Sequence, residues 1–119
     1  MKRVFISQPM NGMEESDILQ IRQDIINAVE KTWDDIYILD SFLTGAKDVN
    51  PLVCLGHAIT ILSKADVAIF APRWSHSRGC RVEHEICEEY GIPCYHLIKT
   101  KEGYKIDPII NFIGGHLFL

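Results

Sequence analysis

The sequence lacks several features that would assign it at once to a broad class of protein. It holds no uninterrupted apolar run near the roughly 20 residues that a membrane-spanning helix needs, so no membrane partner is expected. It also lacks an excess of basic residues, because 12 Lys and Arg stand against 16 Asp and Glu, for a net charge of -4. Affinity for a phosphate backbone depends on clustered Lys and Arg, so we expect no binding to a nucleic acid polymer.

Cysteine is scarce, and its spacing matches no common motif. The four cysteines, Cys54, Cys80, Cys87 and Cys94, form no CxxC pair. We interpret them as small, buried apolar residues of a reducing compartment. The N-terminal MKRVFISQPM lacks the longer apolar region and the small-residue cleavage site of a secretory signal. Together these features predict a cytoplasmic protein that needs no bound metal or other cofactor.

The length and the pattern of the chain favour one α/β domain. It has 119 residues, 47% hydrophobic and 24% charged, as is ordinary for a single globular domain, and no repeat or linker divides it. Short β-type runs alternate with longer helical segments, which is typical of a parallel sheet with crossover helices. The sequence therefore predicts one domain over residues 1–119. The expected fold is a flavodoxin- or Rossmann-like three-layer sandwich with a mostly parallel sheet of four or five strands.

The expected elements follow one another in the order βαβαβαβ. Strands are predicted at residues 3–7, 36–39, 66–70 and 92–97. Helices are predicted at residues 13–33, 51–64 and 78–90. In the third helix the expected buried stripe is Val82, Ile86 and Tyr90. Residues 99–105 are expected to form a polar turn, and residues 107–112 a short helix.

The carboxyl ends of the first and third predicted strands indicate where a ligand binds. In doubly wound sheets the ligand crevice lies at the carboxyl ends of the strands, where the strand order reverses. With the first and third strands adjacent, residues 7–12 and 71–79 line that crevice. The candidate ligand contacts in these loops are Ser7, Gln8, Gly12, Trp74, Ser77, Arg78 and Gly79. Asp40, at the end of the second strand, is a further candidate that could accept a hydrogen bond from a ligand hydroxyl or could cap a turn.

The segment from Ser75 to Glu85 carries the residue types that such a crevice needs. Ser77 is a candidate N-cap, and the free N–H groups at that helix start would attract an anion such as a phosphate. Three arginines gather positive charge nearby: Arg73, Arg78 and Arg81. Glu83 is expected at the edge of the inner helix face, pointing into the crevice. Near a helix N-terminus its ionised form is favoured, which suits a nucleophile or a hydroxyl acceptor.

Two features in or beside this segment have alternative interpretations. Trp74, just before it, could stack on an aromatic ligand or could cover the core. A third, metal-dependent function would use a set of ligands spaced by four: His76, Cys80 and His84. Gly79 and the serines before it favour a helix that begins after His76, which would separate these side chains.

Three motifs follow one another in a characteristic order. They are V-F-I-S-Q-P-M-N-G, A-D-V-A-I-F-A-P and R-G-C-R-V-E-H-E-I-C-E-E-Y-G-I-P. The chain thereby resembles the nucleoside 2-deoxyribosyltransferase-like superfamily, and especially the small proteins of the DUF4406 family. The resemblance covers most of the chain through Tyr95. In deoxyribosyltransferases the Glu of the last motif is the nucleophile, so the resemblance implies that role for Glu83.

The resemblance also implies a partner and a reaction. The partner would be a small-molecule nucleoside or nucleotide. The Glu83 carboxylate would attack the anomeric carbon of a 2-deoxyribosyl group, and the resulting sugar ester would pass to a second base or to water. Related enzymes complete each site with a neighbouring subunit, so the resemblance implies a homo-oligomer.

The sequence departs from the transferase pattern at three places. Phe5 stands where the family has a first-strand Tyr that assists the nucleophile, and His57-Ala58 where it has an Asp that serves the base. Ser77-Arg78 replace acidic residues and resemble nucleoside 5′-monophosphate N-glycosidases, in which a Ser near this point meets phosphate. The sequence thus leaves two main functions open. One is N-glycosidic bond cleavage or deoxyribosyl transfer through Glu83, and the other is non-catalytic nucleotide binding by a sensor or sponge.

Overall fold

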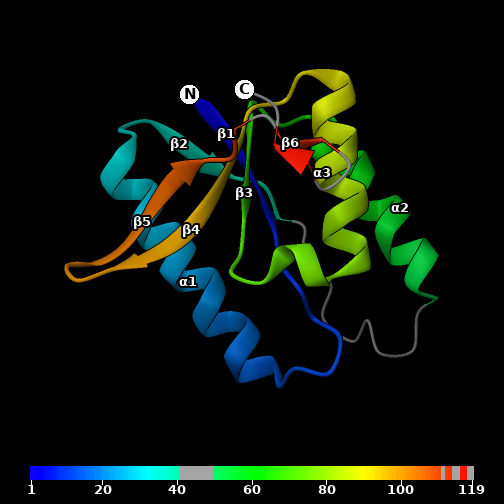
Figure 1. The fold of residues 1–119 in the computed structure, drawn as a ribbon, viewed down its shortest axis with the longest axis horizontal. Helices are drawn as coiled ribbons and strands as arrows, with labels where there is room; N and C mark the ends of the chain where they lie inside the picture. The colour runs from blue at the N-terminus through cyan, green and yellow to red at the C-terminus, as the bar shows by residue number, and fades with distance from the viewer. Residues whose placement is uncertain (41–49, 111, 114–115, 118–119) are drawn as a thin grey trace.

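Strands and helices alternate along the chain and build one five-stranded sheet (Figure 1). The computed structural model describes residues 1–40, 50–110, 112–113 and 116–117. The strands of the sheet are β1 (Lys2–Ser7), β2 (Ile36–Ile38), β3 (Val67–Phe70), β4 (Cys94–Thr100) and β5 (Gly103–Pro108). The α-helices are α1 (Glu15–Thr32), α2 (Pro51–Leu62) and α3 (Arg78–Tyr90). A short 3-10 helix, η2 (Trp74–His76), precedes α3, and β6 (Phe112–Ile113) pairs with β7 (His116–Leu117).

The strand order β2-β1-β3-β4-β5 reverses direction at β1. β1 pairs in parallel with β2 on one side and with β3 on the other, and β3 pairs in parallel with β4. Phe5 lies opposite Ala68, and Ser7 lies opposite Phe70. The carboxyl ends of β1 and β3 are therefore neighbours, as the sequence predicted, and this is the place where such sheets open a crevice.

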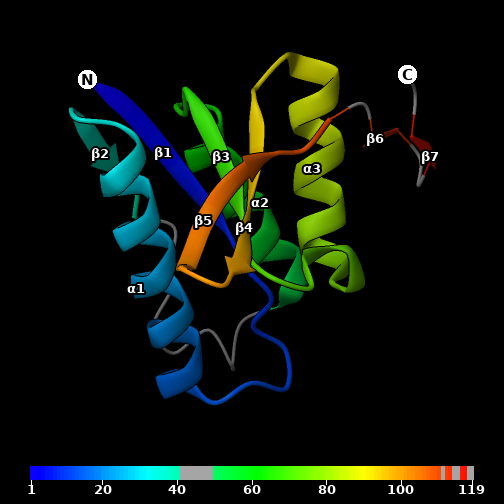
Figure 2. The ribbon, with the colours of Figure 1, turned by 60° about the vertical axis from the view of Figure 1, so that its left-hand side comes forward.

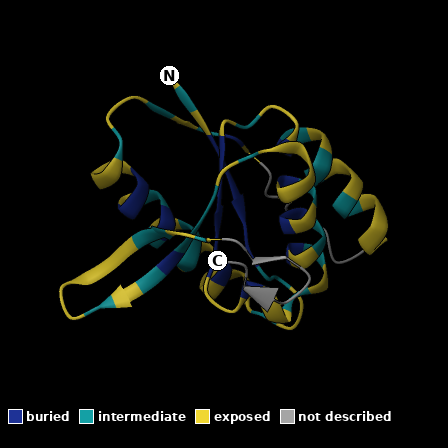
Figure 3. Ribbon diagram, turned by 45° about the horizontal axis from the view of Figure 1, so that its top comes forward, coloured by how far each residue is buried: buried dark blue, intermediate teal, exposed yellow. Residues whose placement is uncertain are grey.

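Helices cover both faces of the sheet (Figure 2). On one face Ile25 of α1 packs in a buried cluster with Val4 and Ile69 of the central strands. On the other face Phe5 of β1 packs in a second cluster that includes Cys87 of α3. Successive side chains of β1 and β3 point to opposite faces, so the two strands are buried on both sides. The central strands are accordingly the most buried part of the fold (Figure 3).

The start of α2 and both ends of α3 form where the sequence predicted them, whereas α2 ends at Leu62, two residues before the predicted end. The Asn50 side chain accepts the Leu52 N–H at 2.8 Å, and Pro51 occupies the first turn, where its missing N–H costs nothing. The Ser77 hydroxyl accepts the Cys80 N–H at 3.5 Å and begins α3. Gly91 ends α3 in a left-handed conformation with φ of 73°, which glycine adopts without strain.

The prediction of a polar turn over residues 99–105 was right only at Lys101 and Glu102, and the structure describes no helix over residues 107–110 and 112. β4 continues to Thr100, and β5 returns antiparallel beside it, with Leu97 opposite Ile106. Ile106 packs against the cluster beneath α1, while Lys101 and Glu102 are exposed at the tip of this hairpin (Figure 3). An edge strand with one exposed side has a weak sequence signal, because its partner strand supplies most of its order. The sheet is therefore mixed, with four parallel strands and one antiparallel edge strand.

The buried face of α3 also differs from the predicted stripe. Val82 and Ile86 are only half-buried, and Tyr90 is 80% exposed. The residues that α3 buries are Cys80, Glu83, His84 and Cys87. This set has the spacing of one helix face, rotated from the apolar stripe by about one residue. The prediction failed because the inner face of α3 carries polar and thiol side chains, which hydrophobic periodicity does not count.

Two further expectations concern a membrane-spanning helix and the segment between β2 and α2. In the part of the chain that the structure describes, no helix is both long enough and apolar enough to cross a bilayer. Residues 42–50, which join the second predicted strand to the second predicted helix and are expected to form a loop, lie outside the described residues except at Asn50.

Candidate functional site

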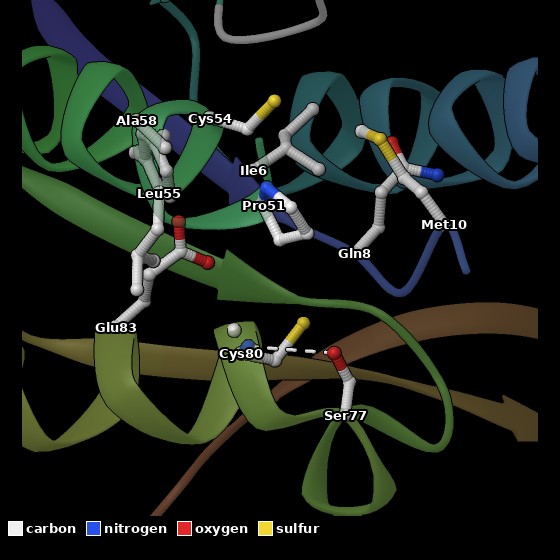
Figure 4. Close-up of a pocket in the computed structure, with 12 residues that line it drawn as sticks. Ile6, Gln8, Met10, Pro51, Cys54, Leu55, Ala58, Ser77, Cys80 and Glu83 are labelled. Carbon is white, nitrogen blue, oxygen red and sulfur yellow. Dashed lines mark hydrogen bonds between the residues drawn. The ribbon is translucent and has the colours of Figure 1, made fainter. Parts of the chain in front are cut away.

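A pocket of about 220 Å³ opens at the carboxyl end of β1, between the first halves of α2 and α3 (Figure 4). Its sheet side is formed by Phe5, Ile6, Gln8 and Met10. Its α3 side is formed by Ser77, Gly79, Cys80 and Glu83. The opposite wall comes from α2, with Pro51, Cys54, Leu55 and Ala58. The pocket therefore places an apolar wall across from a side that holds a carboxyl, a hydroxyl and the start of a helix.

Glu83 is the one carboxylic acid among the described residues that line this pocket. It is 7% exposed, and its carboxyl group points across the pocket toward α2 (Figure 4). The hydroxyl of Ser7 donates a hydrogen bond to Oε1 of Glu83, with an oxygen–oxygen distance of 2.6 Å. The last residue of β1 thus holds a side chain that lies 76 positions later in the chain. This contact orients the carboxyl within the pocket wall.

Burial changes the acidity of this carboxyl. It raises the pKa of Glu83 from 4.5 to about 7, while the hydrogen bond from Ser7 acts in the opposite direction with less effect. The sequence predicted that the helix N-terminus would favour the ionised form, and this was wrong. Glu83 is the sixth residue of α3, beyond the first turn in which the helix dipole acts, so desolvation dominates. Near neutral pH both forms are populated, so the group can accept or donate a proton.

Two further residues that line the pocket complete the polar side of the site. Burial raises the pKa of the Cys80 thiol, which is therefore neutral at pH 7 and a poor nucleophile. Gln8 is 7% exposed, and its Nε2 donates to the Ile18 carbonyl at 3.0 Å. Among the described residues no donor reaches the buried Oε1 of Gln8. A buried acceptor without a donor is costly.

The structure brings together about half of the predicted site residues. Those that line the pocket are Phe5, Gln8, Ser77, Gly79 and Glu83. Ser7 joins them through its bond to Glu83. The pocket wall does not include Gly12, Asp40, Trp74 or Arg78. Gly12 is exposed in a turn, and Asp40 is exposed as well. Burial lowers the pKa of Arg22, and the charge of Asp40 opposes this shift with less effect.

Trp74 and the arginines lie outside the pocket wall for different reasons. Trp74 packs against the rings of Phe70 and His84, with centroid distances of 5.1 and 4.6 Å, so it covers the core. Arg78 is exposed, and Arg81 donates from Nη1 to the Ser75 carbonyl at 3.1 Å. The positive charge that the sequence predicted near α3 therefore flanks the pocket instead of lining it.

The metal-binding alternative receives no support from the described residues. They contain no group of three or more His, Cys, Asp or Glu side chains that could hold a metal ion. His76 is exposed in η2, whereas His84 is buried beneath Trp74 and Cys80 faces the pocket. The three side chains thus lie in different surroundings.

The α2 wall is the part of the site that sequence reasoning missed. Pro51, Cys54, Leu55 and Ala58 are spaced as one helix face. The structure leaves both Leu55 and Ala58 half-buried. The spacing in the sequence predicts an apolar helix face. It does not tell whether that face packs on the core or lines a crevice.

Comparison with known proteins adds no relative, because no protein-family model and no curated protein matches the chain significantly.

Proposed function

We propose that the protein cleaves the N-glycosidic bond of a nucleoside or nucleoside 5′-monophosphate, or transfers its deoxyribosyl group, with Glu83 as the nucleophile. The observation that carries this proposal is the buried pair of Ser7 and Glu83, joined by a 2.6 Å hydrogen bond beside the pocket. The resemblance of residues 78–93 to the deoxyribosyltransferase motif supports the same role for Glu83.

The geometry suggests a separate role for Ser7 and for Glu83 in the reaction. The Ser7 hydroxyl holds Oε1, and the second oxygen of the ionised Glu83 attacks the anomeric carbon. As the new carbon–oxygen bond forms, the bond to the base nitrogen breaks, and its electron pair leaves with the base. Water or a second base then displaces Glu83 from the sugar ester, which restores the free carboxylate. The departing base takes up a proton from solvent or from a donor group.

The size and lining of the pocket favour a small, partly apolar ligand. Its volume of about 220 Å³ is smaller than the roughly 300 Å³ at which pockets for drug-sized ligands begin. Leu55 and Ala58 on the α2 wall suit the face of a base, and Gln8 and Ser77 suit polar groups of the ligand. A 5′-phosphate would meet the Ser77 hydroxyl and the N-terminus of α3, because no Lys or Arg is among the described lining residues.

A second candidate function is nucleotide binding without turnover. The observation that favours it is that Glu83 has no second carboxyl beside it among the described lining residues. Glycosidases generally use two carboxyl groups, one of which protonates the leaving group. A site with one carboxyl could hold a nucleotide and release it unchanged, as a sensor or sponge does.

The proposal extends to the fold family and the compartment. The strand order β2-β1-β3-β4-β5, with helices on both faces, supports a flavodoxin-like three-layer sandwich with an antiparallel edge strand. The cysteines Cys54, Cys80, Cys87 and Cys94 are free thiols, which supports a cytoplasmic location.

A chromatographic screen tests the two functions against each other. Deoxynucleosides, ribonucleosides and their 5′-monophosphates are incubated with the wild type, with Glu83→Gln, and with Glu85→Gln as a matched control at an exposed position of the same helix. We expect free base from the wild type and the control, and none from Glu83→Gln. Thermal stabilisation by a nucleotide that is recovered intact would instead establish the binding function. If no compound is cleaved and none stabilises the folded protein, both candidate functions are wrong.

A further inference from the structure

The Glu83 pocket holds a buried acidic group whose charge the described residues do not balance. Glu83 is 7% exposed, and the Ser7 hydroxyl that donates to its Oε1 is neutral. Among the described residues that line the pocket there is no Lys, Arg or His. Burial therefore acts on the carboxyl without a positive partner, and it raises the pKa of Glu83 to about 7. The ionised form, which the proposed reaction needs, lacks a counter-charge within the described part of the pocket.

The arginines at the start of α3 do not supply that counter-charge. Arg78 and Arg81 are exposed, and neither of them lines the pocket. Arg81 is turned toward the Ser75 carbonyl, to which its Nη1 donates at 3.1 Å. Water and salt screen charges strongly at exposed positions. The described residues therefore leave the counter-charge of Glu83 to the ligand.

The described lining is also poor in groups that could protonate a departing base. Glu83 is the one carboxylic acid among these residues, and it must be ionised to act as a nucleophile. The other O–H and S–H groups there belong to Ser77, Cys54 and Cys80, and thiols are weak hydrogen-bond donors. Burial raises the pKa of the Cys80 thiol, which therefore keeps its proton more firmly. A neutral base leaves such a site slowly, because it needs a proton as its bond to the sugar breaks.

We propose that the substrate of this site is an N-glycoside whose base is a positively charged aromatic ring, of the pyridinium class. This inference rests on the proposed function of Glu83 and names the class of its substrate. The positive charge of the ring balances the buried carboxylate. The ring also leaves as a neutral molecule, which requires no proton. One property of the ligand thus accounts for both features of the pocket.

The reaction of such a substrate balances without an acid. The second oxygen of Glu83 forms a bond to the anomeric carbon, while the Ser7 hydroxyl holds Oε1. The bond from that carbon to the ring nitrogen breaks, and its electron pair stays on the nitrogen and cancels the charge of the ring. Water then attacks the anomeric carbon, Glu83 leaves as a carboxylate, and a proton of the water passes to solvent. In the first step positive charge moves from the ring onto the sugar, where the carboxylate stabilises it.

The lining and the size of the pocket suit a single aromatic ring. Leu55 and Ala58 of α2 lie across the pocket from Glu83, so a flat ring fits between an apolar wall and the carboxylate (Figure 4). A delocalised charge is more weakly hydrated than an ammonium group, so it enters a partly apolar pocket at a lower cost. The volume of about 220 Å³ favours one ring over two. The net charge of -4 also attracts cations to the protein.

Initial rates of base release, measured by chromatography at about pH 8, test the substrate class. The probes are the ribosides and 2-deoxyribosides of nicotinamide, whose ring is charged, and of uracil, which is a neutral single ring. We expect kcat/KM to be at least about a hundredfold higher for the nicotinamide glycosides. Cleavage of the uracil glycosides at an equal or higher rate would overturn the inference and leave the proposed function intact. If other nucleosides are cleaved and neither probe is, only the inference fails, and if nothing is cleaved, the catalytic function fails with it.

Binding of a ligand that cannot be cleaved tests the charge by itself. 1-Methylnicotinamide carries the pyridinium charge without a sugar, and its 1,4-dihydro form has the same non-hydrogen atoms and no charge. In calorimetric titrations at about pH 8, the wild type should bind the cation at least about tenfold more tightly than the neutral ring. Equal dissociation constants would overturn the inference even if a nicotinamide glycoside were cleaved, because the cleavage would then reflect only the reactivity of that compound.

Two variants identify the group that recognises the cation. Glu83→Gln keeps the acceptor for Ser7 but lacks the charge, so it should bind the two rings with equal affinity within about a factor of two. Glu85→Gln is the matched control, because it removes one negative charge at an exposed position of the same helix and should keep the preference. A cooperative thermal transition checks that each variant is folded. A preference that persists in Glu83→Gln, or that is lost in Glu85→Gln, would overturn the inference.

Discussion

Two cavities lie between α2 and α3, one at each end of the sheet, and they differ in both size and chemistry. The cavity at the amino ends of β3 and β4 is the larger, at about 720 Å³ against about 220 Å³ for the Glu83 pocket. Its lining includes Ile59, Ile86 and Pro93, together with one carboxyl group, that of Asp66. The larger space is therefore mostly apolar, and the smaller one holds the buried polar groups.

The two carboxyl groups show what the difference in surroundings does. Hydrogen bonds from Arg3 hold the pKa of the exposed Asp66 below its ordinary value, with Arg3 Nε 3.2 Å from Oδ2. Burial instead raises the pKa of Glu83 to about 7. The ion pair at the surface stabilises the ionised form of Asp66, whereas burial destabilises the ionised form of Glu83 and brings its pKa near neutral pH. The comparison teaches that the candidate site differs from the larger cavity in the burial of its carboxyl group rather than in its volume.

The largest effect is expected when the two carboxyl groups are neutralised separately. Glu83→Gln keeps the shape and the acceptor for Ser7 but removes the nucleophile, so base release should fall at least about a thousandfold. Asp66→Asn should leave the rate within about a factor of two, because Asp66 lies at the other end of the sheet. Chromatographic initial rates on one substrate measure both. Equal losses in the two variants would contradict the distinction between the cavities.

The next largest effect is expected in the pH dependence of the free energy of unfolding. Because the pKa of Glu83 is raised in the folded state, the folded protein keeps a proton between pH 4.5 and about 7 that the unfolded chain has lost. Stability should therefore fall as pH rises through this window and then level off. Between about pH 5 and about pH 8 the loss should be about 2–3 kcal/mol.

Urea unfolding of the wild type and Glu83→Gln at both pH values measures this contribution. The glutamine variant should lack that pH dependence, and it should be the more stable of the two at the higher pH. If both proteins respond to pH in the same way, the buried carboxyl does not have a raised pKa.

A smaller effect is expected from the hydroxyl that holds Glu83. Ser7→Ala removes a buried hydrogen bond, which should cost about 1 kcal/mol, and it should raise the pKa of Glu83 further, because that bond lowers it. The acidic limb of the pH–rate profile should shift to higher pH. Ser63→Ala is the control at the larger cavity, where Ser63 donates to the Thr60 carbonyl on the exposed surface. A pH profile that stays in place in Ser7→Ala would show that Ser7 does not act on Glu83.

The smallest effect is expected at the rim of the larger cavity. Tyr90 is 80% exposed, so Tyr90→Ser should change the free energy of unfolding by no more than about 0.5 kcal/mol. Ligand-induced thermal stabilisation and base release should both match the wild type. Loss of ligand binding in this variant would move the binding site from the Glu83 pocket to the larger cavity.

Much of the fold was predictable because its signals are local. Pro51 at the start of α2, Ser77 at the start of α3 and Gly91 at its end each act within a few residues, and the predicted helices over residues 51–64 and 78–90 begin at these positions. The apolar residues of β3 are also a local signal for the strand predicted over residues 66–70, and the structure buries all four residues of β3. The antiparallel β5 was not predictable, because its order depends on pairing with β4 and not on its own six residues.

The candidate site also has features that the sequence predicts and features that depend on tertiary packing. The sequence by itself determined where the site lies, because the order of strands and helices brings the end of β1 and the start of α3 to one edge of the sheet. Only the tertiary structure decided the acidity of Glu83, since that depends on how much water reaches the carboxyl and on the distant Ser7. It also decided that α2, and not Trp74, forms the opposite wall. How deeply a side chain is buried and which way it points depend on the residues packed around it, so a single segment of sequence does not determine them.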